Sequence, residues 1–348
     1  MHTPTKLKCQ IVTSADINFL PAACCMLISI RDNLPASMPV SCLLAGVDID
    51  DHDIETANRF LEQHQMPPCV ESFSSDELIN DGFHVSERVT KAGYLRLALD
   101  SIVPAEFDRL LYLDADTRVL APIEPLLLSD LEGYPFAAAH DIGQYQDDRI
   151  KQARELLGMP ETAGYFNSGV MLFDWKLTLK TGLLSDVRDY AASNPRKWQY
   201  HDQDALNAVA AGRWKALDPR WNLNDYYFAM GGTKTPWIKH YTGAKPWSKW
   251  RRPIWKADSA WFERILKNSP WPEAYEQQTW REKLVMLRDY LRTSSRNPAR
   301  AIAYYLWPFL MSAGAKRRAA AYLNRDKPDI EAIIEEFMPG TEGITGSQ

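Results

Sequence analysis

The chain has 348 residues, of which 45% are hydrophobic and 24% are charged, and its formal net charge is −5. This composition excludes an intrinsically disordered chain and leaves room for one large domain or two. The longest nearly apolar run, residues 301–315, is shorter than the ~20 residues that cross a bilayer and contains Pro308, so no membrane-spanning helix is predicted.

The charge is unevenly distributed along the chain. Residues 1–250 carry 24 Lys and Arg against 33 Asp and Glu, residues 251–325 carry 15 against 6, and residues 326–348 carry 1 against 6. A basic block beside an acidic body indicates an anionic partner, either a membrane or a nucleic acid. No nucleic-acid-binding motif accompanies the charge, so a membrane is the favoured partner.

The cysteines indicate a reducing compartment. All five lie in the first 70 residues, and no C-x-x-C occurs. An odd number without this motif predicts reduced thiols in a cytoplasmic protein. The first eight residues contain no apolar signal core, which agrees with that location.

Strands alternate with helices at the start of the chain. Strands are predicted at residues 7–13, 40–44 and 69–73, and helices at residues 19–32 and 51–65. This alternation predicts an α/β fold with a mostly parallel sheet, and such sheets bind ligands beyond the carboxyl ends of their strands. Asp16 and Asn18 follow the first strand, so they either contact a nucleotide or form a polar turn that caps the next helix.

The next segment ends in two acids. A helix predicted at residues 86–101 carries Arg96 and leads into a buried strand, residues 110–113, which stops at Asp114 and Asp116. In an extended segment these two carboxylates would point to the same side, and they would repel each other unless a cation lay between them. Mg²⁺ and Mn²⁺ both prefer carboxylate oxygens. The alternative is a polar turn, where Asp is common.

Small and polar residues interrupt the apolar strand predicted at residues 165–174, namely Asn167, Ser168 and Gly169. A glycine inside a strand indicates either a close approach by a ligand or another backbone, or a bulge. The Asn167 amide can donate and accept, which suits a sugar hydroxyl. Another strand, predicted at residues 136–140, ends at Asp141.

Two later segments carry further candidates. Asp202, Gln203 and Asp204 begin a helix, where acidic residues also serve as caps. His240 ends a strand and is followed by Gly243 and Lys245. The imidazole could bind a metal and the lysine could meet a diphosphate, although a lone histidine is more often structural.

Six stretches in this order resemble the family 8 glycosyltransferases, whose relatives include bacterial lipo-oligosaccharide galactosyltransferases and glycogenin. They are residues 12–19 (VTSADINF), 91–99 (KAGYLRLAL), 111–117 (LYLDADT), 165–172 (YFNSGVML), 201–207 (HDQDALN) and 240–247 (HYTGAKPW). The resemblance implies a GT-A fold, a Rossmann-like sheet flanked by helices, in residues 1–250. It also implies retaining transfer of a hexose from UDP-galactose or UDP-glucose, with Mn²⁺, or Mg²⁺ in its place, as cofactor.

The resemblance also implies roles for the candidate residues. Asp114, Asp116 and His240 match the metal ligands, and Asp16 and Asn18 match residues near the uridine. Residues around the donor sugar are matched by Arg96, Asn167, Asp202 and Gln203, with Ser168 beside them. Gly243 and Lys245 match the diphosphate contacts, although only Ala244 separates them here where the family often has two residues.

Retention of configuration requires a covalent glycosyl-enzyme or attack from the side of the leaving group. Catalytic candidates are Asp202, Gln203 and Asp204; Gln203 is an amide and a poor nucleophile, whereas Asp204 is a carboxylate. We favour same-face attack, in which the leaving phosphate assists deprotonation of the acceptor. Within the metal pair, Asp116 is expected to be the principal ligand. Asp114 is expected to share its oxygens with the donor and to be oriented by Arg96.

Tryptophans and basic residues are interleaved from residue 250 onward, where the tryptophans are Trp250, Trp255, Trp261, Trp271 and Trp280. This pattern predicts that residues 251–325 form a helical extension on the anionic inner face of the cytoplasmic membrane, followed by an acidic tail at residues 326–348. A helical cap with a solvated basic face is the alternative.

The predicted activity is therefore hexosyl transfer to a lipopolysaccharide core or another cell-surface glycan. One alternative is a sugar-nucleotidyltransferase, but residues 14–18 lack the glycine and basic residues of its N-terminal loop. The other is a nucleotide-sugar-binding membrane protein without turnover.

Overall fold

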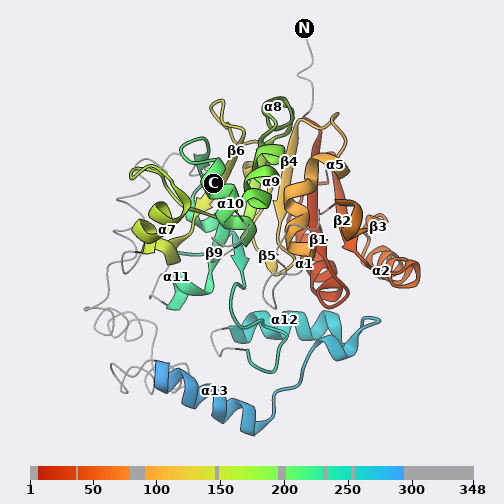
Figure 1. Cartoon of the computed structure of the whole chain (residues 1–348). Helices are drawn as coiled ribbons and strands as arrows, with labels where there is room; N and C mark the ends of the chain where they lie inside the picture. The colour runs from red at the N-terminus through yellow and green to blue at the C-terminus, as the bar shows by residue number, and fades with distance from the viewer. Residues whose placement is uncertain are drawn as a thin grey trace. The chain divides into compact units, whose positions relative to one another are not determined.

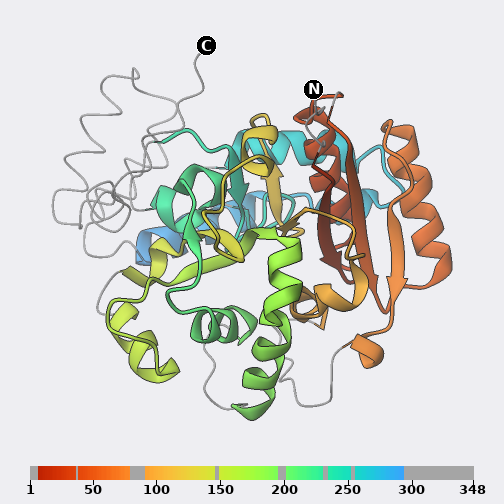
Figure 2. The same ribbon diagram turned by 90° about the horizontal axis from the view of Figure 1, so that it is seen from above.

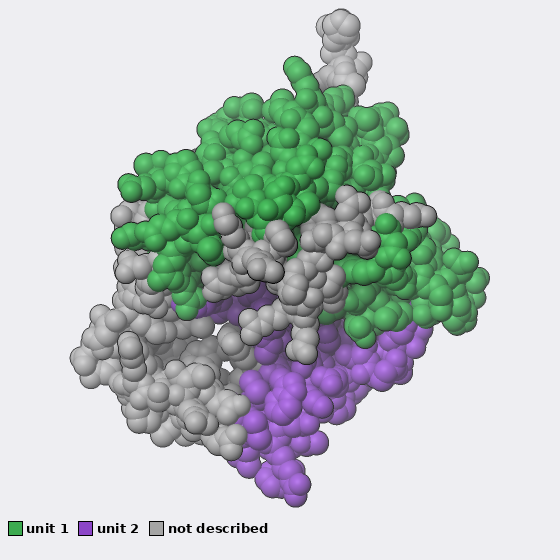
Figure 3. All heavy atoms as spheres, viewed as in Figure 1, with its two compact units in different colours: residues 1–223, 234–240, 336–348 green, residues 224–233, 241–335 purple. Residues whose placement is uncertain are grey.

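The computed structural model describes residues 7–36, 38–78, 91–145, 149–194, 201–229, 234–251 and 255–293. The contacts divide the chain into two compact units (Figure 3). Unit 1 contains residues 1–223, 234–240 and 336–348, and unit 2 contains residues 224–233 and 241–335.

Unit 1 is built on a seven-stranded sheet with the strand order β3-β2-β1-β4-β7-β6-β8 (Figure 1). Its strands are β1 (Cys9–Ala15), β2 (Val40–Val47), β3 (Val70–Phe73), β4 (Arg109–Leu113), β6 (Phe136–His140), β7 (Phe166–Asp174) and β8 (Lys215–Ala216). Every neighbouring pair is parallel except the two pairs that β7 makes with β4 and β6. The predicted mostly parallel sheet is therefore confirmed, and β7 alone runs against the other strands.

The reversal of β7 decides what lies at the functional edge of the sheet. The parallel strands present their carboxyl ends there, whereas β7 presents its amino end. Residues just after β4 and residues at the start of β7 consequently meet, and the Asp114 N–H donates to the Gly169 carbonyl at 2.8 Å.

Helices flank the sheet. In unit 1 they are α1 (Leu20–Asp32), α2 (Asp51–Gln63), α3 (Ser75–Leu78), α4 (Lys91–Tyr94), η1 (Leu95–Ala98), α5 (Leu99–Ile102), α6 (Glu124–Leu127), η2 (Ile142–Tyr145), α7 (Arg149–Leu157), α8 (Trp175–Thr181), α9 (Leu183–Ser193), α10 (His201–Val209) and η3 (Pro219–Asn222). Local sequence explains several starts: Pro21 lies in the first turn of α1, and the Asp50 and Asp174 side chains cap α2 and α8.

The helix expected at residues 86–101 differs from the prediction. Residues 86–90 lie outside the described part of the chain, and the remainder is broken into α4, the 3₁₀ turn η1 and α5. Arg96 lies in the 3₁₀ turn, where its side chain is buried. A buried guanidinium needs several partners, and here its Nε donates to the Gly93 carbonyl of the preceding turn at 2.9 Å.

The main core lies between the sheet and one group of helices. Leu110 and Tyr112, which alternate along β4, pack in one cluster with Leu184 of α9 and Leu206 of α10. Figure 2 shows these green helices on one side of the sheet. The same alternation carries the chain to Asp114 at the sheet edge, so core packing determines where this carboxylate lies.

Unit 2 contains α11 (Asp225–Ala229), α12 (Lys256–Leu266), η5 (Pro272–Ala274) and α13 (Trp280–Thr293). Its interior is aromatic: Tyr241 makes edge contacts with Trp255 at 5.3 Å and Phe262 at 5.8 Å, measured between ring centroids. Trp255 is buried. This tryptophan therefore fills a core and is not available to a membrane, which corrects one part of the expected aromatic surface.

Other parts of that surface do lie exposed on unit 2. Trp280 is 66% exposed and Leu284 53% exposed. None of the helices in the described ranges is long and apolar enough to cross a membrane. The apolar run at residues 301–315, the basic residues that follow it and the acidic tail at residues 326–348 lie outside the described residues.

Candidate active site

The two acids after β4 lie in a tight turn, not in an extended segment as predicted. The Thr117 N–H donates to the Asp114 carbonyl at 3.0 Å, and the Thr117 hydroxyl donates to the same oxygen at 2.8 Å. The turn ends where β5 (Thr117–Val119) begins. The carboxylates still converge, because the turn brings the side chain of Asp116 back toward that of Asp114.

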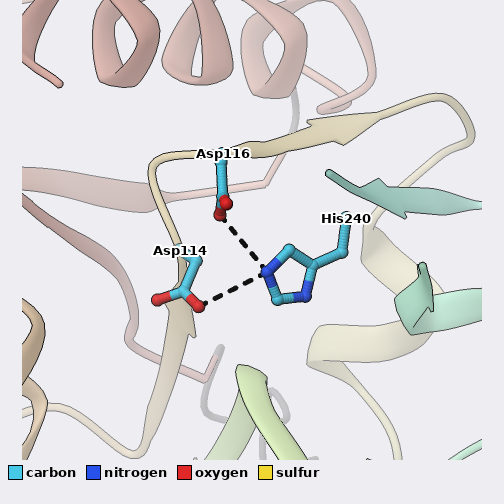
Figure 4. A group of neighbouring side chains, drawn as sticks. All are labelled: Asp114, Asp116 and His240. Carbon is cyan, nitrogen blue, oxygen red and sulfur yellow. Dashed lines mark ion pairs between the residues drawn. The ribbon is translucent and has the colours of Figure 1, made fainter. Parts of the chain in front are cut away.

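His240 reaches this turn through strand pairing. It ends β10 (Ile238–His240), which pairs antiparallel with β5, and its register partner is Thr117. These strands belong to a three-stranded sheet of order β5-β10-β9, in which β9 is Leu223–Asn224. The Nε2 atom of His240 lies 3.2 Å from Oδ1 of Asp116 and 3.5 Å from Oδ2 of Asp114 (Figure 4).

Gly169 makes this arrangement sterically possible. A Cβ atom at this position would lie 2.2 Å from Cε1 of His240 and 2.7 Å from Oδ2 of Asp114. The glycine expected to mark a close approach does so, although the approaching group is an imidazole. The pairing of β6 with β7 also changes register between Ala138 and His140, opposite this segment, so the predicted irregularity is present as well.

The three side chains fit a divalent cation. Their ligand atoms all lie within 4.8 Å of one another, and two opposed ligands of one Mg²⁺ are about 4.2 Å apart. Two carboxylate charges within 4.8 Å of each other repel by at least roughly 3 kcal/mol at an effective dielectric constant of about 20. Two carboxylates and an imidazole are also a donor set that suits Mn²⁺. The residues present therefore fit a metal, and a cation would remove the repulsion.

Arg96 connects the acids to the neighbouring helix. Its Nη2 lies 2.8 Å from Oδ1 of Asp114, and its Nε lies 2.6 Å from Oδ2 of Asp202. Its Nη1 donates to the Ser168 hydroxyl at 2.9 Å. The sequence left open whether this arginine is solvated, and the structure shows a buried side chain that contacts both carboxylates. The expected contact between Arg96 and Asp114 is present.

The start of α10 supplies three buried polar side chains beside β7, those of Asp202, Gln203 and Asp204. Burial raises the pKa of Asp202 to about 6, and the positive charge of Arg96 only partly offsets this effect. The Gln203 Oε1 accepts the Ser168 N–H at 3.1 Å. Asp204 accepts a hydrogen bond from the buried Tyr165 hydroxyl.

Asp141 belongs to this cluster and was not included among the candidates predicted from sequence. The Gln203 Nε2 donates to its Oδ2 at 2.9 Å, and the Asn167 Nδ2 lies 3.5 Å from the same oxygen. Burial raises the pKa of Asp141. Its position directly after strand β6 was a usable signal, because the carboxyl ends of parallel strands lie at the same edge.

Asn222 of η3 was also missed. Its Nδ2 donates to Oδ1 of Asn167 at 2.8 Å, and its Oδ1 lies 3.0 Å from Nδ1 of His240. No pattern in the sequence singles out this asparagine, which ends a capped 3₁₀ turn directly before a two-residue strand.

The remaining candidates lie on two other segments. Asp16 follows β1, and its Oδ1 accepts the N–H groups of Asn18 at 3.0 Å and Phe19 at 3.1 Å, so it forms the expected polar turn. It is not the N-cap of α1, because that position is Phe19, which makes no side-chain cap bond. Asn18 is exposed in this turn. Gly243 and Lys245 belong to unit 2, where the Lys245 Nζ donates to the Tyr241 carbonyl at 2.6 Å.

A mostly parallel sheet that carries polar side chains beyond the carboxyl ends of its strands binds its ligand at that end of the sheet. The family model described as "Glycosyl transferase family 8" matches residues 10–251. The chain therefore belongs to glycosyltransferase family 8, as its sequence motifs predicted, and it is a glycosyltransferase.

The chain is also similar to individual relatives. General stress protein A of Bacillus subtilis (strain 168) is 28% identical over 257 residues, which cover 69% of this chain and 87% of that protein. Lipopolysaccharide 1,2-glucosyltransferase of Escherichia coli (strain K12) is 29% identical over 228 residues, covering 62% of this chain and 65% of the relative.

A solved structure supports the fold. The galactosyltransferase LgtC, crystallised with donor and acceptor sugar analogues, superposes with a TM-score of 0.64 at 22% identity. The match covers 79% of this chain and 99% of LgtC. The GT-A fold predicted from the sequence is thus confirmed.

Proposed function

We propose that this glycosyltransferase moves galactose or glucose from a UDP-sugar to a glycan acceptor, with retention of anomeric configuration. The lipopolysaccharide core or another cell-surface glycan is the proposed acceptor. The observation that carries the proposal is the cluster of Asp114, Asp116 and His240, with the buried Arg96 against one of its carboxylates. The name of the lipopolysaccharide glucosyltransferase relative supports the choice of acceptor.

The cluster would hold Mn²⁺, with Mg²⁺ as the alternative. When bound, such a cation offsets the negative charge that develops on the UDP leaving group. Asp116 is proposed as the principal ligand, because Arg96 engages Asp114 at 2.8 Å and competes for its oxygens. Asp16 and Asn18 are proposed to contact the nucleotide, and Gly243 and Lys245 the diphosphate.

The donor sugar is proposed to bind beside the buried polar groups of β7 and α10. Asn167, Asp202 and Gln203 offer donors and acceptors for hydroxyl groups, and Ser168 holds Arg96 in place. A site built to hydrogen-bond particular hydroxyls discriminates strongly against a sugar that leaves these buried groups unpaired.

Same-face attack is the proposed route to retention, with the leaving phosphate assisting deprotonation of the acceptor hydroxyl. Asp204 is disfavoured as a nucleophile because it is buried and accepts a hydrogen bond from Tyr165, which would have to be broken before attack. Gln203 is an amide. Trapping a sugar on Asp204 of the wild-type protein, detected by mass spectrometry, would overturn this mechanism.

UDP release measured over a panel of UDP-sugars, with and without Mn²⁺, tests the activity. We expect turnover with UDP-galactose or UDP-glucose that requires the metal and is lost in Asp116→Ala. Membership of the family favours this activity over the two alternatives considered from the sequence. Release of a nucleoside triphosphate from a UDP-sugar and pyrophosphate would instead indicate a nucleotidyltransferase.

We further propose that residues 251–325 bind the anionic inner face of the cytoplasmic membrane. Trp280 and Leu284 on α13 are exposed, and the Arg281 guanidinium carbon lies 5.4 Å from the Trp280 ring centroid. Basic and aromatic side chains on one helix suit such an interface. Sedimentation with anionic liposomes should fall in a Trp280→Ser, Leu284→Ser double variant, and equal sedimentation of both proteins would contradict the proposal.

A further inference from the structure

The state of His240 depends on which ring nitrogen carries its hydrogen. Only a nitrogen with a free lone pair can bind a metal, and neutral imidazole has one such nitrogen. Nε2 faces the carboxylates, at 3.2 Å from Asp116 and 3.5 Å from Asp114. Nδ1 faces Oδ1 of Asn222 at 3.0 Å. The metal site therefore requires the tautomer with hydrogen on Nδ1.

A chain of hydrogen bonds specifies this tautomer, and it starts at a backbone group that can only donate. The Gly169 N–H donates to Oδ1 of Asn167 at 3.0 Å, which fixes the orientation of that amide. The same oxygen accepts from Nδ2 of Asn222 at 2.8 Å, so the second amide is fixed in turn. The Asn222 oxygen then faces His240, and an amide oxygen can only accept.

The Nδ2 group of Asn167 also has a partner in this orientation of the amide. Nδ2 of Asn167 lies 3.5 Å from Oδ2 of Asp141, which accepts a stronger bond from Gln203 at 2.9 Å. The side chains of Asn167, Asn222 and His240 are all buried. A flipped amide would therefore leave buried donors and acceptors mismatched, and each mismatched group costs about 1–3 kcal/mol.

We propose that Asn222 is a positioning residue, which holds His240 in the Nδ1–H tautomer and so directs the lone pair of Nε2 toward Asp114 and Asp116. The relay begins at the peptide of Gly169, whose carbonyl also accepts the Asp114 N–H at 2.8 Å. One residue of β7 thus positions two of the metal ligands through its two backbone groups. The proposal rests on the metal site of the proposed function.

The tautomer can be read directly from ¹⁵N chemical shifts of the imidazole in the metal-free, full-length protein at pH 8, with His240→Gln used to assign the signal. Mn²⁺ affinity is measured by isothermal titration calorimetry with the metal alone. We expect hydrogen on Nδ1 in the wild-type protein. In Asn222→Leu we expect a mixture of tautomers and a 10- to 100-fold loss of Mn²⁺ affinity, the usual cost of losing such a partner.

Two further variants separate positioning from folding. Asn222→Asp retains an acceptor for the Nδ1–H, so it should keep the wild-type tautomer and most of the affinity. Asn167→Asp retains the oxygen that accepts from Gly169 and Asn222, so the relay and its tautomer should also persist there. If Asn222→Leu loses its fold, the proposal still requires hydrogen on Nδ1 in both aspartate variants, and an Nδ1 without hydrogen in either would overturn it.

The outcomes distinguish this inference from the proposed function. An Nδ1 without hydrogen in the wild-type protein, or a folded Asn222→Leu with unchanged tautomer and Mn²⁺ affinity within twofold of wild type, would overturn the relay. Failure of the wild-type protein to bind Mn²⁺ would instead contradict the proposed metal site, whereas the ¹⁵N shifts would still decide whether the relay exists.

Discussion

Replacing Gly169 with alanine should disable the metal site more than the fold. The added Cβ would lie 2.2 Å from Cε1 and 2.6 Å from Nδ1 of His240, and 2.7 Å from Oδ2 of Asp114. Carbon atoms in contact are about 3.5–4.0 Å apart, so the imidazole must retreat by more than about 1 Å. Metal–ligand distances are held to about 0.2 Å, and a displacement of this size removes the third ligand.

The expected loss of Mn²⁺ affinity follows from these distances. Loss of an outer partner alone reduces metal affinity about 10- to 100-fold, so displacing a ligand should reduce Mn²⁺ affinity by about 100-fold or more. Overpacking should lower the free energy of unfolding by about 1–3 kcal/mol, which leaves a folded protein to assay. Calorimetric titration of the metal-free variant with Mn²⁺ measures the first effect, and thermal unfolding measures the second.

Gly133→Ala is the matched control. Gly133 has a φ of +80°, and a Cβ there would meet nothing within 4 Å. Alanine should therefore cost about 1–2 kcal/mol of backbone strain without touching the metal ligands. We expect this variant to unfold at a lower temperature than the wild type and to bind Mn²⁺ with the same affinity. A Gly169→Ala protein that binds Mn²⁺ within threefold of the wild type would refute the steric reasoning.

Three further predictions concern charge at the site. Arg96→Lys should lower kcat/KM by about 10- to 100-fold, because an ammonium group lacks the planar fork that contacts Asp114 and Asp202 together; unchanged UDP release would contradict this. Burial raises the pKa of Asp202 to about 6, so its negative charge, present above that pH, is lost as pH falls through 6. Activity at saturating Mn²⁺ should fall with an apparent pKa near 6, and the same acid limb in Asp202→Asn would argue against the assignment. When Mn²⁺ is added at 100 times its Kd to protein first stripped of metal with a chelator, the free energy of unfolding should rise by about 2.7 kcal/mol. An equal increase in Asp116→Ala would exclude the cluster as the binding site.

Much of the fold could be predicted because the periodicity of hydrophobic residues and the ends of strands are local properties of the sequence. The apolar run at residues 110–113 required a buried strand, and the carboxylates after it had to lie at a sheet edge. His240 was found for the same reason, since it also ends a strand. Its partner strand β5 could not be read from the pattern, because three residues carry too little periodicity to identify a strand.

The parts that escaped prediction depend on contacts between distant segments. Asn222 acts through hydrogen bonds to Asn167 and His240, 55 and 18 positions away, and neither bond leaves a local signature. Trp255 shows the opposite error, because its position among basic residues suggested a surface whereas Tyr241 and Phe228 enclose it. Composition identifies an aromatic segment, but burial depends on which neighbours the chain brings to it.

The pairing of β5 with β10 gives the metal centre a place in the order of folding. Asp116 and His240 are 124 positions apart in the sequence, and the chain between them contains β6, β7 and α10. During synthesis the acidic pair leaves the ribosome long before the imidazole does, and closing so long a loop is a late and slow event. A chain that ends before residue 240 contains both carboxylates but not the three-ligand site. Stable metal binding would therefore report that the chain has been made and folded at least as far as His240.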